Sequence, residues 1–210
     1  MTSSISNKIA SHVYSKIGPL QTNYLADYSS AKAELAELRR SANNPKASFK
    51  IWSLVFDNLD EELIGKGDRF NRAERALLTT FQLYAIHQQS SNKPMHVTAK
   101  TTGAEQSFPQ GLGTAVRRIA NPNDSDDWEQ AILRRFSSVV NASTFEGTKH
   151  HLRGLIQIFR AKDIPLNYGL LAKDLYRLQF PEAVQSVHLR WARELYQRSP
   201  ETSKTAEVSA

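Results

Sequence analysis

Six basic residues stand between Ala131 and Lys162, and Glu146 is the one acidic residue among them. The local net charge is +5 (6 − 1), whereas the whole chain of 210 residues has 27 basic and 21 acidic residues and a net charge of +6. Most of the surplus charge therefore lies in one segment, which otherwise has the apolar spacing of core-forming helices. A rigid basic surface of this kind is suited to binding a polyanion. The six residues are Arg134, Arg135, Lys149, Arg153, Arg160 and Lys162.

The spacing of these arginines predicts where they lie on helices. Arg153 and Arg160 are seven residues apart, which is two turns along one side of a helix. Arg134 and Arg135 belong to the preceding helix, and a short connection favours antiparallel packing that would merge the two basic edges. Guanidinium groups suit phosphate because they donate two parallel hydrogen bonds. The sequence leaves open an ordinary solvated face with salt bridges.

Further basic candidates end other predicted helices. Arg39 and Arg40 close a helix over residues 23–40, and Arg118 ends a helix that opens near Gly111. Cations at a helix C-terminus are favoured by the helix dipole, so a purely structural role explains them equally well. They remain candidates for phosphate contact.

A long polar loop over residues 90–110 adds Lys93, His96 and Lys100. Loops of this length in compact domains are often functional, so we count Lys93 and His96 as candidate nucleic-acid-binding residues. The tryptophans Trp52, Trp128 and Trp191 lie on or near apolar stripes and are predicted to be core. Because aromatic residues are not interleaved with the basic ones, the sequence predicts contact with a nucleic-acid backbone rather than base readout.

Other chemistries lack the residues that they need. The chain has no cysteine, which excludes disulfides, iron–sulfur clusters and thiolate zinc sites. Its six histidines show no metal-ligand spacing, and Gly111-x-Gly113 lacks the strand and the Lys-Ser/Thr of a phosphate loop, so it indicates a helix entry or a tight packing site. No nucleophile, base and orienting group occur together. We expect no enzyme activity, no cofactor, no metal and, because no apolar run is long enough, no membrane contact in a cytoplasmic protein.

The basic residues must be held by helices, because no stretch alternates as a strand would. We predict an all-α fold of two small helical bundles packed into one elongated body. The bundles span residues 23–120 and 125–198, after a weakly ordered lead-in over 1–22 and before a disordered tail over 199–210. The predicted helices cover residues 23–40, 48–59, 71–89, 111–119, 146–161, 168–178 and 181–196, with one more from about 126 to 140.

Nine short strings occur in an order and spacing that resemble the CasB family, the small subunit of the type I-E CRISPR Cascade complex. Each string is weak alone, but nine in order are specific, and they extend from about Leu35 to Tyr196. The strings are Leu38–Arg40, Leu83–Gln88, Met95-His96, Leu112–Val116, Arg134–Phe136, His151–Gln157, Ile164–Tyr168, Leu171–Leu175 and Leu189–Arg193. The loop between the third and fourth strings is longer than is usual for the family.

The resemblance implies a non-catalytic subunit without cofactor or small-molecule substrate. It implies that two copies lie along a crRNA-guided complex, beside the other Cascade subunits and the crRNA. There they would support the single strands of target DNA in the R-loop while guide pairing reads the sequence. The strings carry Arg39, Arg40, Arg134, Arg135 and Arg153; charge and position add Arg118, Arg160, Lys93 and His96.

A second hypothesis remains from a different class. The chain would then be a helical protein–protein adaptor whose basic face binds an acidic partner protein. Salt dependence separates the two, because neutralising phosphates makes log affinity fall linearly with log salt.

Overall fold

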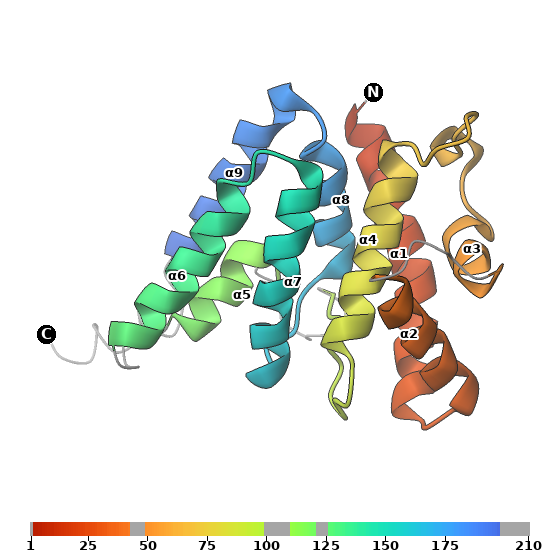
Figure 1. Ribbon diagram of the computed structural model, residues 1–210, viewed down its shortest axis with the longest axis horizontal. Coiled ribbons are helices and arrows are strands. Elements are labelled where there is room, and N and C mark those ends of the chain that lie inside the picture. Colours follow the sequence, from red (N-terminus) through yellow and green to blue (C-terminus); the bar gives the residue numbers. More distant parts are fainter. Residues whose placement is uncertain (1, 43–48, 99–109, 121–125, 198–210) are drawn as a thin grey trace, which may run out of the picture.

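The computed structural model describes residues 2–42, 49–98, 110–120 and 126–197, without the side chains of residues 2–3 and 126–129. Within these residues the regular elements are helices and no β-strand is present, which confirms the all-α prediction (Figure 1). An isolated bridge joins His96 to Leu166. None of the described helices has both the length and the hydropathy needed to cross a bilayer.

The chain begins with a long helix, α1 (Thr2–Leu25), where the sequence predicted a weakly ordered lead-in. That prediction is wrong because Ile9, Val13 and Ile17, spaced by four residues, are fully buried in the core. The helix packs against α8 (Tyr168–Arg177). Frequent serines and the Gly18-Pro19 pair obscured this stripe in the sequence.

The helix predicted over residues 23–40 is divided. α1 ends at Leu25, and Asp27 has a φ of 69°, a left-handed conformation that interrupts helical hydrogen bonding. Helix α2 (Ser29–Ser41) follows. Its last turn contains Arg39 and Arg40, as predicted for the basic pair. Two short elements follow, α3 (Phe49–Phe56) and the 3-10 helix η1 (Glu61–Leu63).

Helix α4 (Arg72–His87) is the centre of the fold. It begins at a capping box in which the Asn71 side chain accepts from the Glu74 amide and the Glu74 carboxylate accepts from the Asn71 amide. Nearly all of its residues are buried, because α2, α7 (Phe145–Ala161) and α8 pack around it. In Figure 1, α4 and α7 run in the same direction, and α7 turns back antiparallel to the preceding helix, α6 (Asp126–Val140).

The remaining helices, α5 (Leu112–Ile119) and α9 (Pro181–Tyr196), pack closely. The amide of Gly113 donates to the Glu194 carboxylate at 3.1 Å, and a Cβ at Gly113 would lie 2.8 Å from the Cβ of Glu194. Gly111 caps α5. The interpretation of Gly111-x-Gly113 as a helix entry and packing site is therefore confirmed.

Most of the buried apolar residues form one cluster that runs from Ile9 in α1 to Leu195 in α9. The predicted boundary between two bundles, residues 121–124, and the predicted tail over 199–210 lie outside the described residues. The division into two bundles therefore stays a prediction, and the contact of α1 with α8 crosses it.

Candidate nucleic-acid interface

Four of the predicted arginines line one pocket. Arg39 and Arg40 come from the last turn of α2, and Arg153 and Arg160 come from α7. The pocket has a volume of about 460 Å³, and we call it the arginine pocket. Its lining residues are Ala36, Arg39, Arg40, Ile86, Gln89, Arg153, Gln157 and Arg160.

Local sequence places these side chains on helix faces that point away from the core. In α7 the residues Leu152, Leu155, Ile156 and Phe159 are fully buried, so the stripe at 153, 157 and 160 faces outward. The N-terminus of α7 is capped by Thr144, because Oγ1 of Thr144 accepts from the amide of Gly147 at 3.1 Å. In α2, burial of Leu35 and Leu38 turns Arg39 and Arg40 toward α7.

Neutral oxygens orient two of the guanidinium groups. Nη1 of Arg39 donates to the carbonyl of Ala85 at 3.3 Å, and Nη1 of Arg160 donates to Oε1 of Gln89 at 3.1 Å. Both acceptors belong to the C-terminal end of α4 or the residues just beyond it. These contacts hold the arginines in place without neutralising their charge.

The arginine pocket concentrates positive charge. Among the described residues, no carboxylate lies within ion-pair distance of Arg39, Arg40 or Arg160. Burial lowers the pKa of the Arg39 guanidinium, and the neighbouring charges of Arg160 and Arg40 act in the same direction. Because like charges repel here, an anion that enters the pocket gains attraction from several arginines at once.

Arg135 extends this surface onto α6. Its Nη1 lies 3.9 Å from the position that a Cβ would occupy at Gly154, which is next to Arg153 on α7. Arg134 is exposed on the same helix but does not line the arginine pocket. The basic edges of α6 and α7 therefore meet through Arg135.

The structure does not bring the other candidates to this pocket. Nζ of Lys93 is 2.6 Å from Oδ2 of Asp163, and Arg118 is exposed on α5. The prediction for His96 is wrong: its ring is only 5% exposed and its Nδ1 accepts from the Tyr168 amide at 3.2 Å. Burial lowers the pKa of His96 to about 4, so it is a neutral residue of the core. Lys100 lies outside the described residues.

Sequence reasoning missed the uncharged members of the site. Gln89 and Gln157 line the arginine pocket, and the spacing of 153, 157 and 160 contains the signal for Gln157. Trp191 is fully buried as predicted, but Trp52 is 43% exposed, which corrects its assignment to the core. The side chain of Trp128 lies outside the description. Among the described residues, no group of three His, Asp or Glu side chains is placed to hold a metal ion.

Comparison with known proteins gives both a family and solved relatives. The family model of CRISPR-associated protein Cse2 matches residues 34–196. A crystal structure of CasB from Thermobifida fusca is 30% identical, with a TM-score of 0.71 over 90% of this chain and 98% of that chain. A chain of a CRISPR RNA-guided surveillance complex shares the fold at 17% identity, with a TM-score of 0.61 over 94% of this chain and 99% of that one. No curated protein matches the chain.

Proposed function

Because this chain belongs to the CRISPR-associated protein Cse2 family, we propose that it is a non-catalytic small subunit of a type I-E Cascade complex. In this role it binds the sugar–phosphate backbone of the single strands in the R-loop. The observation that carries the proposal is the convergence of Arg39, Arg40, Arg153 and Arg160 on one pocket. Its partners are the crRNA, the other Cascade subunits and a second copy of itself, in the cytoplasm.

The chemistry of the arginine pocket supports backbone contact. Guanidinium groups bind phosphate oxygens through paired hydrogen bonds, and the two glutamines can donate or accept beside them. These groups distinguish an anion from a neutral ligand but do not by themselves distinguish one base from another. A subunit of this kind needs no sequence readout, because pairing with the guide supplies it.

The test is the salt dependence of binding to a short single-stranded DNA. The double variant Arg40→Gln and Arg153→Gln removes two pocket charges. If each arginine neutralises one phosphate, the slope of log affinity against log salt becomes about 1.4 less negative. The control double variant, Lys32→Gln and Lys50→Gln, removes the same charge from exposed positions on α2 and α3, and its slope stays closer to that of the parent.

Two results would contradict the proposal. One is the absence of binding to single-stranded DNA or RNA at low salt by a folded protein. The other is an equal change of slope in the two double variants, which would indicate a general charge effect instead of a site. If the folded protein binds an acidic protein partner but no nucleic acid, the adaptor hypothesis replaces this one.

A further inference from the structure

A second pocket, of about 700 Å³, lies beside the arginine pocket and has a different character. Three of its lining residues, Trp52, Phe56 and Phe70, have aromatic rings that stack on one another. The ring centroids of Trp52 and Phe70 are 5.5 Å apart, and those of Trp52 and Phe56 are 5.8 Å apart. We call it the aromatic pocket. Its described lining includes Ser41, Trp52, Phe56, Phe70, Gln82 and Lys149.

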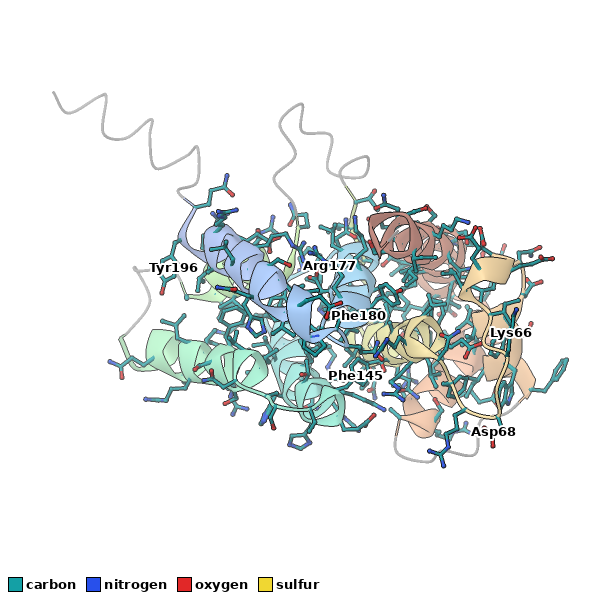
Figure 2. The ribbon with its side chains drawn as sticks, turned by 90° about the horizontal axis from the view of Figure 1, so that it is seen from above. Lys66, Asp68, Phe145, Arg177, Phe180 and Tyr196 are labelled. Atoms are coloured by element: carbon teal, nitrogen blue, oxygen red, sulfur yellow. The ribbon has the colours of Figure 1, made fainter. Side chains whose placement is uncertain are left out.

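The two pockets lie along the same three helices, α2, α4 and α7. On α4, Gln82 lines the aromatic pocket and Gln89, just beyond the helix, lines the arginine pocket. Seven helical residues correspond to about 10 Å along the axis. On α7 the equivalent neighbours are Lys149 and Arg153, one turn apart. Figure 2 looks down on the end where α4 and α7 begin, and it labels Phe145 on α7 and Asp68 in the loop before α4.

Gln82 leaves a buried acceptor without a partner in the aromatic pocket. The residue is 4% exposed, and its Nε2 donates to Oγ of Ser41 at 3.1 Å. The Ser41 hydroxyl uses its own proton to donate to the carbonyl of Leu38 at 2.8 Å, so it can only accept from Gln82. That chain of hydrogen bonds determines which end of the amide faces Ser41, and Oε1 has no hydrogen-bond donor among the described residues.

Trp52 offers an accessible aromatic ring at the same place. It is 43% exposed although it is the largest side chain of the cluster, and its ring stacks beside the partly buried rings of Phe56 and Phe70. The positive side chains of Arg69, Arg75 and Lys149 also line the pocket. An accessible ring, an unpaired acceptor and nearby cations are together the groups that a nucleobase on a phosphate backbone uses.

The acidic residues of the aromatic pocket are compatible with this ligand. The carboxylate of Glu74 accepts from the amides of Gly65 at 2.7 Å and Asn71 at 2.8 Å, so its oxygens are occupied. Oε2 of Glu146 lies 3.9 Å from Nζ of Lys149. Asp68 is exposed in the loop before α4.

We propose that the aromatic pocket binds one unpaired nucleobase of the strand whose phosphates lie in the arginine pocket. The base stacks on Trp52, and an N–H group on its edge donates to Oε1 of Gln82. This inference rests on the proposed function and adds a base-holding site to it, without selecting a sequence. It goes beyond the sequence-based expectation of contact with the backbone alone, which stays a prediction.

The experiment compares two oligonucleotides that have the same phosphates but differ in their bases. One is a single-stranded DNA of mixed sequence, and the other has the same length with abasic sugars throughout. Stacking of one base contributes enough for the parent protein to prefer the base-containing strand by about 5- to 150-fold. Trp52→Leu loses most of that preference, and Gln82→Leu reduces it through a separate contact. The control Phe49→Leu, an 86% exposed aromatic residue of the same helix outside the pocket, keeps it.

Each result decides something different. Equal affinity of the folded parent for both strands overturns the base site, and so does a full preference retained by both Trp52→Leu and Gln82→Leu. If the abasic strand still binds with an arginine-dependent salt slope, the proposed function stands without the base site. If neither strand binds, both the proposed function and the base site fail.

Unchanged binding of both strands by Trp52→Leu, together with loss of assembly into the complex, would assign the aromatic pocket to a protein partner instead. Circular dichroism checks that each variant is folded.

Discussion

The hydroxyl of Tyr168 lies 2.9 Å from Nδ1 of His87, and neither residue is exposed to solvent. This contact joins α8 to α4 at the centre of the core. Burial lowers the pKa of His87 to about 3, so the ring is neutral in the folded protein at ordinary pH. His87 is therefore a hydrogen-bonded structural residue of the core.

Acid should therefore weaken the folded state below neutral pH. The unfolded chain protonates its histidines near pH 6.5, whereas folded His87 and His96 stay neutral to about pH 3 and 4. Their contribution to the stability of the folded state is complete above pH 6.5 and is lost as the pH falls toward the pKa values of the folded protein. Each histidine lowers the free energy of unfolding by about 1.4 kcal/mol per pH unit in that window. Urea denaturation at pH 7 and pH 5 measures this fall in the free energy of unfolding.

The variant His87→Asn separates this effect from general acid sensitivity. It is less stable than the parent at pH 7, but its free energy of unfolding changes less between pH 7 and pH 5 because one buried histidine is gone. His150→Asn, at an exposed position on α7, serves as control and keeps the slope of the parent. An unchanged slope in His87→Asn would show that His87 is protonated in the folded protein.

A buried carboxylate connects α8 to α9. Oδ2 of Asp174 accepts from Nε1 of Trp191 at 2.7 Å, and its other oxygen contacts the guanidinium of Arg190. Asp174→Ala leaves the indole N–H and the half-buried guanidinium without this partner. We expect a loss of about 3 kcal/mol in the free energy of unfolding, measured by urea denaturation.

The matched control for Asp174 is Asp57, whose carboxylate pairs with Lys16 at an exposed site. Asp57→Ala should cost much less, because solvent already screens its ion pair. If the two variants lost similar stability, the network between α8 and α9 would not be a special determinant of the fold.

Two glycines should respond in opposite directions to the same substitution. Gly113→Ala places a methyl group against the backbone of Trp191 and the side chain of Glu194, so it forces α5 and α9 apart. We expect a loss of about 2 kcal/mol or more. Gly154→Ala meets only Nη1 of Arg135 at 3.9 Å and replaces a helix-interior glycine, so it should stabilise by up to about 1 kcal/mol. Thermal unfolding of both variants ranks them.

How far the sequence predicted the fold depended on local signals. Helix α4 was found because its apolar spacing is regular and no glycine or proline interrupts it. Helix α1 was missed because serines fill the turns between Ile9, Val13 and Ile17, and because its burial depends on α8, which is distant in sequence. The break at Asp27 has no glycine or proline to mark it.

The candidate site was predictable in part for the same reason. Helical spacing placed Arg153 and Arg160 on one face, but the approach of α2 that adds Arg39 and Arg40 is a tertiary contact. Charge alone could not distinguish Lys93, which pairs with Asp163, from an arginine without a carboxylate partner. The exposure of Trp52 was hidden because an aromatic residue at helical spacing usually indicates core.

Lys93 and Arg160 provide a last comparison, because each variant removes one positive charge from the same end of the molecule. Arg160→Gln removes a pocket arginine that contacts Gln89, so the salt slope for single-stranded DNA should become about 0.7 less negative. Lys93→Gln removes a cation that already pairs with Asp163 at 2.6 Å, and its slope should stay close to that of the parent. Fluorescence anisotropy of a labelled oligonucleotide across a salt series measures both slopes. A larger change in Lys93→Gln than in Arg160→Gln would move the interface from the arginine pocket to the loop that contains Lys93.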